Sequence, residues 1–468
     1  MVYHPAMGDA CRQLVPRALR AVMGMALLLC WGLGSCRGAE ALPERLSVLD
    51  NGVLRIGIDL NRGGAVTLLE AKARPGNLIN NADYGRQIQM SVYSGPIPFA
   101  PHGKQPRPEW RGLGWNPIQT GDCSGRPSRV EESRNDGSEL YVRLIPMQWP
   151  LADEPGDCTF ESWTTLEGSS VHMRFRVSMQ REDRTQYPAR TQELPAVYAI
   201  SALHRVMSYT GEHPFSGDAL AELHNDWTRP WPWTAWVATE GWSAMVGDDD
   251  WGIGVFREEG CRFNGGLYRE AGSRDAHGGP TTYLAPVEQE TLDHDLVYQH
   301  ACTLVVGTLQ EIRSRCNRLA DGPALPPAWR FSGPTRQHWH VDGASDGGLP
   351  QQDGWRIHLG EAIPRLVSPC RCWPAAGNTL LTLTISWAGP PTTGRLLWSR
   401  SDALALDGSR SVPLALVGDG SPHRYQLDLA HAAGYHGLIT GIAIDPVGEP
   451  HPASELVIHD LTFGSASR

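Results

Sequence analysis

The sequence predicts an all-β protein in which a large two-sheet supersandwich is followed by a smaller β-sandwich. Short segments of alternating apolar and polar residues recur along the chain, separated by turns rich in Gly, Asn and Asp. The long amphipathic helices that a βαβ protein places between its strands are missing from the pattern. The 468 residues exceed one ordinary domain, and a Pro-rich stretch at 321–329 divides them.

Residues 43–320 make up the first predicted unit. Its opening stretch, 45–71, alternates as strands do and contains the hairpin-type turns "DNG" and "NRGG". Further strand patterns follow at 138–150, 169–180 and 241–260. One helix is expected near residue 310, in "GTLQEIRSRCNRLADG", where it would close this unit.

Residues 330–468 make up the second predicted unit, after the linker at 321–329. Its strands recur at regular spacing with turn signals between them, at 378–387, 394–400, 423–430, 438–446 and 455–463. This spacing is typical of a β-sandwich.

Residues 1–41 have the form of a signal peptide. An arginine-containing segment precedes the apolar run at 21–34, which is too short and too interrupted to span a membrane. The segment "AEA" at 39–41 is a cleavage site of small residues, which the sequence slightly favours. The competing segment "LGSC" at 33–36 resembles a bacterial lipobox, in which Cys36 would carry a lipid anchor. Either outcome predicts export to the periplasm, the cell surface or the extracellular medium, with a membrane attachment only through Cys36.

Cysteines are numerous enough to form bridges in an exported chain. Seven of them follow the leader, and because seven is odd, at least one is left unpaired or pairs elsewhere. Cys123–Cys158 and Cys302–Cys316 are candidate disulfides, although spacing alone does not determine the connectivity.

The composition bears on the kind of partner. The net charge of −10 argues against a nucleic-acid partner, because phosphate binding needs a basic surface. Seventeen Trp outnumber the 12 Tyr and the 8 Phe. Indoles offer a flat apolar face and one N–H donor, which suits sugar rings. The alternative is that most of these Trp residues are core residues of a large β-protein.

The stretch "NNADYGRQIQMSVYSG" (80–95) is the first candidate site. Read as a strand, it has one mainly apolar face, while the other face carries Gln87, Gln89 and Tyr93. Amides both donate and accept, and so match the neighbouring hydroxyls of a sugar. These three residues, together with Arg86, are predicted to bind substrate. The alternatives are a solvated outer face, or buried amides that satisfy backbone groups.

The loop "WNPIQTGDC" (115–123) is a second source of polar groups. Trp115, Gln119 and Asp122 are predicted to line the same cleft and to bind substrate. The alternative is an ordinary turn made by "NP" and "TGD".

The stretch "YPARTQELPAVYAI" (187–200) carries the main catalytic candidate. Glu193 lies in a neutral-to-apolar setting, where burial raises a carboxyl pKa and suits it to general acid or base catalysis. Tyr198 is predicted to assist it and Arg190 to bind substrate. The alternative is a structural pair of Glu193 with Arg190.

The Trp-rich stretch "ELHNDWTRPWPWTAWVATEGW" (222–242) is the last candidate. Its prolines are incompatible with a regular central strand, so a loop or a sheet edge is expected. His224 and Asp226 are predicted to be catalytic partners of Glu193. The indoles predicted to stack on the sugar are Trp227, Trp231 and Trp233. The alternative is a Trp-rich plug between the sheets.

Two resemblances are carried by short motifs. The opening "NGVLRIGIDLNRGGAVTLL" before "NNADYGRQIQ", in a nearly all-β stretch of this length, resembles the galactose-mutarotase-like fold. In the second unit, "GLITGIAIDP" followed by "ELVIHDLTF" resembles the jelly-roll modules appended to secreted glycan-active proteins. The first fold includes epimerases, polysaccharide lyases and sugar-recognition domains, so the fold alone does not decide the function.

These resemblances imply an exported carbohydrate-active protein that binds and processes a polysaccharide or oligosaccharide. The reaction classes implied are those of a lyase, a glycoside hydrolase or an epimerase, and the alternative is a non-catalytic glycan-binding protein of the cell surface. The usual metal, nucleotide and nucleophile-elbow motifs are missing, so we expect neither a metal nor a cofactor.

Overall fold

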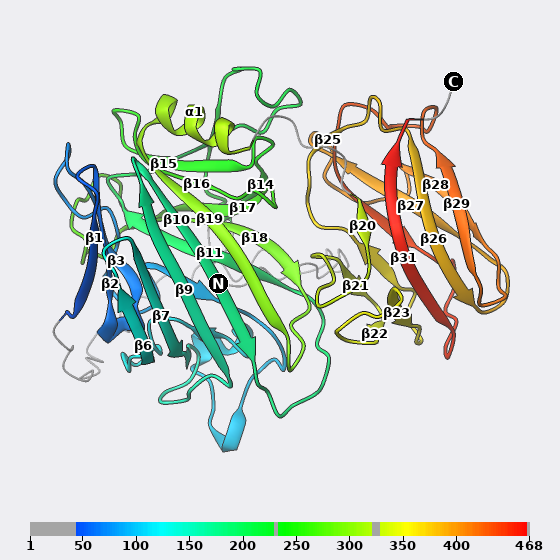
Figure 1. Cartoon of the computed structure of the whole chain (residues 1–468), viewed down its shortest axis with the longest axis horizontal. Coiled ribbons are helices and arrows are strands. Elements are labelled where there is room, and N and C mark those ends of the chain that lie inside the picture. Colours follow the sequence, from blue (N-terminus) through cyan, green and yellow to red (C-terminus); the bar gives the residue numbers. More distant parts are fainter. Residues whose placement is uncertain (1–43, 229–232, 321–327, 466–468) are drawn as a thin grey trace, which may run out of the picture.

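The computed structural model describes residues 44–228, 233–320 and 328–465, and shows two β-sandwiches side by side (Figure 1). The predicted all-β class, with a large sandwich followed by a smaller one, is confirmed. The leader with Cys36 and most of the linker lie outside the described residues, and Trp329 already belongs to a strand. None of the helices in the described ranges is long and apolar enough to cross a membrane.

One sheet of the first sandwich, here called the site sheet, has ten strands. Its main path runs through β1 (Leu46–Asp50), β2 (Leu54–Asp59), β3 (Ala65–Ala71), β4 (Ile88–Ser91), β11 (Arg190–Ile200), β18 (Thr281–Glu290), β17 (Arg262–Tyr268) and β14 (Thr234–Val237). Two short strands continue from β4, namely β5 (Pro117–Ile118) and β8 (Met147–Gln148). The 3-10 turns between these strands are η1 (Leu60–Arg62), η2 (Pro101–Gly103) and η3 (Pro108–Leu113).

The other sheet, here called the backing sheet, has nine strands. Its order is β13 (Ala221–Leu223), β12 (Arg205–Ser208), β15 (Trp242–Val246), β16 (Trp251–Phe256), β19 (Val297–Thr308), β10 (Ser170–Met179), β9 (Cys158–Glu167), β7 (Glu139–Ile145) and β6 (Arg129–Asn135). The main core lies between the two sheets, because alternate side chains of each sheet face the other. In β4 and just beyond it, Ile88, Met90 and Val92 enter this core, as their alternation predicts.

Helix α1 (Leu309–Leu319) follows β19 directly, and the helix expected near residue 310 is confirmed. A capping box begins it, because the Thr308 hydroxyl accepts from the Glu311 N–H while the Glu311 carboxylate accepts from the Thr308 N–H. The helix packs Ile312 and Cys316 against the outer face of the backing sheet, beside Trp242.

The two expected disulfides are not formed, since all seven described cysteines are free. Cys302 faces the core between the sheets. Cys316, a residue of α1, packs on the opposite face of the backing sheet, in one cluster with Val305 of β19. The sheet itself therefore separates these two thiols. In the other expected pair, Cys158 lies in the main core and Cys123 is half-buried in a loop.

The second sandwich has two six-stranded sheets. One contains β22 (Ser345–Asp346), β23 (Trp355–His358), β31 (Glu455–Gly464), β26 (Leu380–Ala388) and β29 (Pro422–Asp428), with β20 (Trp329–Arg330) on β31. The other contains β21 (His340–Asp342), β24 (Arg365–Val367), β30 (Leu438–Asp445), β27 (Thr392–Arg400) and β28 (Ser411–Leu416), with β25 (Trp373–Pro374) on β30. The core between them includes six indoles, each at most 4% exposed: Trp329, Trp339, Trp355, Trp373, Trp387 and Trp398. In this sandwich the Trp residues are therefore core residues.

Buried charges join the two sandwiches. Arg336 of the second sandwich pairs with Asp346 of its own sandwich and, at 2.7 Å, with Asp293 of the first. The Gln186 amide, also from the first sandwich, donates to the Asp346 carboxylate at 2.7 Å. Because Arg336 and both of its partners are buried, removing one member of this contact would leave an uncompensated buried charge, which costs more than breaking a surface ion pair.

His338 makes a second polar contact between the sandwiches, and it predicts a pH-dependent stability. Burial lowers the pKa of its ring, but Glu290 and Glu259 outweigh burial and raise the pKa of His338 to about 9. The folded chain therefore holds this proton more tightly than the unfolded chain does. The stabilisation is complete below about pH 6.5, is lost as the pH rises through about 9, and is on the order of 3 kcal/mol.

Urea unfolding at pH 6.5, 8 and 9.5 measures this loss as the difference between the parent protein and His338→Gln. The difference should shrink across this range. The control is His431→Gln at an exposed position, which should show the pH dependence of the parent. A pH-independent difference for His338→Gln would contradict the assignment.

Candidate functional site

A pocket of about 230 Å³ opens on the face of the site sheet that points away from the main core. Its floor comes from β4 and β11, and its walls come from η3, the end of β17 and the segments directly after β8 and before β14. The lining residues are Asp83, Gly85, Arg86, Gln89, Ser91, Tyr93, Trp110, Leu113, Asn116, Ile118, Trp149, Glu193, Ala196, Tyr198, Trp233, Tyr268 and Thr281. Residues predicted from three distant stretches thus share one pocket: Arg86, Gln89, Tyr93, Glu193, Tyr198 and Trp233.

A β-bulge brings Glu193 and Tyr198 to the same side of β11. They are five residues apart, so regular alternation would place them on opposite faces. Glu193 pairs with Ser91 of β4, and Ala196 pairs with Gln89. Three residue steps along β11 therefore match two along β4, so β11 contains one extra residue at Leu194–Pro195. The register against β18 shifts at the same place. Both side chains therefore face the pocket, which is a common use of a bulge at a functional site.

The Glu193 carboxylate accepts two phenolic hydrogen bonds. Tyr93 donates to Oε2 at 2.8 Å, and Tyr283 donates to Oε1. The Ser91 hydroxyl donates in turn to the Tyr93 oxygen at 2.9 Å, which makes a short chain toward the carboxylate. The predicted structural pair with Arg190 is replaced by these contacts, since the guanidinium of Arg190 donates instead to the carbonyls of Leu113, at 2.8 Å, and Ser94, at 3.3 Å.

The phenols around Glu193 stay protonated at neutral pH. Burial, and after it the nearby charge of Glu193, raises the pKa of Tyr93, Tyr198 and Tyr283 well above the ordinary value. Neutral phenols are proton donors, so they stabilise a negative carboxylate. Tyr198 packs on Tyr283 with ring centroids 4.8 Å apart, and Tyr283 packs on Trp233 at 5.1 Å.

Two buried amides that the sequence analysis did not single out hold this cluster in place. The Gln192 amide bridges the backbone of Tyr93, accepting from its N–H at 2.8 Å and donating to its carbonyl at 2.9 Å. Asn116 donates to the Val92 carbonyl at 2.9 Å. The chain position of Tyr93 is thus fixed from both sides, and this fixes the direction of its phenol.

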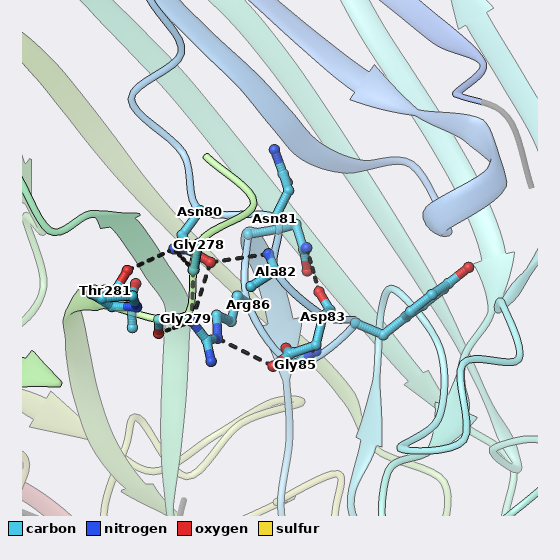
Figure 2. Close-up of polar contacts among 12 residues, drawn as sticks. Asn80, Asn81, Ala82, Asp83, Gly85, Arg86, Gly278, Gly279 and Thr281 are labelled. Atoms are coloured by element: carbon cyan, nitrogen blue, oxygen red, sulfur yellow. Dashed lines mark hydrogen bonds and ion pairs between the residues drawn. The ribbon is translucent and has the colours of Figure 1, made fainter. Parts of the chain in front are cut away.

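Arg86 lies at the pocket edge, where several oxygens orient its guanidinium (Figure 2). Nη1 donates to the Gly279 carbonyl at 2.6 Å, and Nε pairs with the Asp83 carboxylate at 3.2 Å. The Asn80 amide ties the two segments together by donating to the carbonyls of Gly278 and Pro280, both at 3.0 Å. The charge of Arg86 is therefore held in place by groups of the protein itself.

The aromatic wall of the pocket comes from two loops. Trp110, in η3, and Trp149, after β8, meet edge to face with ring centroids 5.6 Å apart. Gly85 leaves room for the Trp149 ring, because a Cβ at residue 85 would lie 2.9 Å from a ring carbon of Trp149. The sequence analysis missed Trp110 and Trp149, because neither lies in a stretch with a periodic pattern, and it also missed Tyr268, the last residue of β17.

The predicted amides act mostly within the protein. Gln89 lines the pocket, but its Nε2 donates to the carbonyls of Tyr84 and Arg86 and its Oε1 accepts from Thr120. Gln87 is fully buried outside the pocket and donates to the Asp83 carbonyl. The alternative of buried amides that satisfy backbone groups thus describes both side chains.

The predicted residues of the loop 115–123 do not line the pocket. Gln119 bonds to the backbone of Met90 and Gly63, and the Asp122 carboxylate accepts three backbone N–H groups of its own turn and of Asp153. Trp115 is fully buried in the main core, where its indole donates to Asp157. Arg190 is likewise outside the lining and supports the loop at Leu113.

The Trp-rich stretch separates into exposed and buried parts. Trp233 lines the pocket, but His224, Asp226 and Trp227 do not, and Trp227 is 65% exposed. Trp231 lies outside the described residues. The pocket therefore brings no imidazole to Glu193 from this stretch. Among the described ranges, no group of three or more His, Cys, Asp or Glu side chains is arranged to hold a metal ion.

Comparisons with known proteins give similarities at the level of solved structures. No protein-family profile matches the sequence, and no curated protein matches it either. A structure from Escherichia coli K12, described as a candidate aldose 1-epimerase, is similar with a TM-score of 0.37 and 12% identity, over 57% of this chain and 100% of that chain. A galactose mutarotase-like protein from Lactobacillus casei ATCC 334 is similar with a TM-score of 0.36 and 11% identity, over 56% and 100%.

A 4-alpha-glucanotransferase from Thermococcus litoralis is similar with a TM-score of 0.30 and 12% identity, over 57% of this chain and 40% of that chain. The resemblance to galactose mutarotase-like proteins that the sequence indicated is thus found again among solved structures. With TM-scores below 0.5 these similarities carry no argument, so the function is argued below from the pocket.

Proposed function

We propose that this chain is an exported enzyme that binds one sugar unit of a carbohydrate in the pocket and uses Glu193 as the proton-transferring group. The observation that carries the proposal is a buried carboxylate that two phenols orient within an aromatic-walled pocket. Carboxylates in such settings are typical general acids and bases. The export part of this proposal is supported by the leader sequence, residues 1–41.

The size and walls of the pocket fit a sugar ring better than a long chain segment. Its volume of about 230 Å³ is below the roughly 300–1,000 Å³ of pockets for drug-sized ligands. Trp110, Trp149 and Trp233 offer flat apolar surfaces, while Arg86 and Asn116 add polar groups. Flat apolar faces beside a few hydrogen-bonding groups match a pyranose, whose ring faces are apolar and whose edge carries hydroxyls.

Among the reaction classes, the residues favour proton abstraction, as in a lyase or an epimerase. Glycoside hydrolysis needs two carboxylates on opposite sides of the scissile bond. Asp83 is the other carboxylate among the lining residues, and it is already paired with Arg86. Glu193 then acts as a single base, with the neutral phenol of Tyr198 as a nearby proton donor and Arg86 as the group that attracts a carboxylate or hydroxyl.

A polysaccharide panel tests the proposal with three readouts. Lyase products carry an unsaturated bond that absorbs in the ultraviolet, whereas hydrolysis gives new reducing ends without that absorbance. Epimerisation would appear as a change in the sugar proton resonances without chain cleavage. Binding without any turnover across the panel would favour the alternative, a non-catalytic glycan-binding protein.

Trp149→Ala should weaken binding of the glycan about tenfold, because stacking on an aromatic ring contributes roughly 0.5–1.5 kcal/mol beyond the burial of apolar area, and about 1.4 kcal/mol is tenfold in affinity. Calorimetric titration with the glycan selected from the panel measures the change. Trp163→Ala is the matched control, because Trp163 lies in β9 of the backing sheet, outside the pocket lining. Equal affinity of Trp149→Ala and the parent would place the sugar elsewhere.

A further inference from the structure

Two thiols from different sandwiches touch at the junction of the molecule. Cys261 lies just before β17 in the first sandwich, and Cys370 lies between β24 and β25 in the second. Their sulfur atoms are 2.9 Å apart, although 109 residues separate them in sequence. Both are buried, with 5% and 8% exposed, and an apolar cluster of Val237, Leu438 and the third thiol, Cys372, surrounds them.

The segment that carries Cys370 is held against the first sandwich by independent contacts. The Arg371 guanidinium donates to the Glu259 carbonyl and lies 3.8 Å from the Glu288 carboxylate. Cys261 and its partner segment are therefore kept together by residues other than the thiols. A disulfide has an S–S bond of about 2.05 Å, so the two sulfur atoms need to approach by less than about 1 Å.

We propose that Cys261 and Cys370 form a disulfide that covalently joins the two sandwiches. The bond forms by thiol–disulfide exchange with a disulfide oxidant, either a small disulfide or an oxidoreductase. One cysteine thiolate attacks the oxidant and releases a thiol, and the second thiolate then attacks the mixed disulfide and releases the other thiol. The two cysteines lose two protons and two electrons, and the oxidant disulfide is reduced to two thiols. This modification goes beyond the proposed function and does not depend on it.

The chemistry of the site indicates when the bond forms. Burial raises the pKa of the Cys261 thiol, and the hydrogen bond with Cys261, together with burial, raises the pKa of the Cys370 thiol. Because the thiolate is the reactive form, the native thiols react slowly. Oxidation is therefore expected while the chain folds and the thiols are still accessible. Once formed, the bond is shielded from external reductants by the same burial.

Peptide mapping tests the pairing without ambiguity, because trypsin cuts at Arg371 between the two candidate partners. The reduced, unfolded chain is refolded with oxidised and reduced glutathione, alkylated with N-ethylmaleimide and digested without reductant. We expect to recover the peptide 258–262, with Cys261, joined by a disulfide to the peptide 366–371, with Cys370. Recovery of both as alkylated single peptides, or of 258–262 joined to 372–395, would overturn it.

A stability measurement gives a second and independent readout. The refolded parent should melt on the order of 5 °C higher than the same protein kept in reductant, because the cross-link restricts the unfolded chain. Cys370→Ser should abolish this difference, whereas Cys302→Ser, at a buried thiol of the main core, should keep it. If Cys370→Ser fails to fold, the peptide map of the parent protein still decides the question.

Discussion

Glu193→Gln is expected to lower the turnover number at least about 100-fold while changing the affinity for the glycan little. Glutamine has the shape of glutamate and keeps an acceptor for a phenol, but its amide does not take up a proton. General acid–base catalysis typically contributes about 10²- to 10⁴-fold, and this sets the size of the loss. Initial rates over a range of glycan concentrations measure kcat and KM separately.

Glu161→Gln is the matched control for this substitution. Glu161 also accepts a hydrogen bond from a phenol, that of Tyr141 at 2.9 Å, but it lies in β9 of the backing sheet. This variant should retain the parent turnover number. A Glu193→Gln protein that folds and keeps full turnover would show that Glu193 is not the proton-transferring group.

Arg336→Met should destabilise the folded chain by about 3–5 kcal/mol, the largest stability effect that the structure predicts. Removing the guanidinium leaves Asp293 and Asp346 buried without their counter-charge. The control is Arg356→Met, whose partner Glu455 is partly exposed and whose loss should cost about 0–1 kcal/mol. Urea unfolding at pH 7 measures both values, and equal effects would contradict the argument.

The same contact predicts a stability loss in acid. Burial raises the pKa of Asp346, but Arg336 outweighs burial and holds the pKa below its ordinary value. The folded chain thus binds this proton more weakly than the unfolded chain. The stabilisation is present above about pH 4 and is lost as the pH falls through the lowered pKa. In Arg336→Met this part of the acid dependence should be absent.

The strands were predictable because their patterns are local. The alternation through Ile88, Met90 and Val92 and the capping residues of α1 depend only on near neighbours in the chain. The same reasoning failed for the side chains of the loop 115–123, because a buried amide and a ligand-binding amide look alike in sequence. Whether Gln119 meets a sugar or the Met90 backbone depends on partners about 30 residues away.

The pocket could be predicted only in part, for two physical reasons. Its aromatic wall comes from loops, such as the one carrying Trp149, which show no periodicity. Moreover, a period-two reading of 190–200 places Glu193 and Tyr198 on opposite faces, and only the bulge brings them together. The sequence did carry one signal, since Pro195 within a strand is unusual and marks such an irregularity.

The bulge in β11 also changes which positions of the strand face the pocket. Before Pro195 the odd-numbered position Glu193 faces the pocket, while after it the even-numbered positions Ala196 and Tyr198 do. A gain or loss of one residue at this point would exchange the two parities downstream, turning core-facing side chains toward the ligand. Related proteins that keep Glu193 and Tyr198 together in the pocket must therefore also keep this one extra residue.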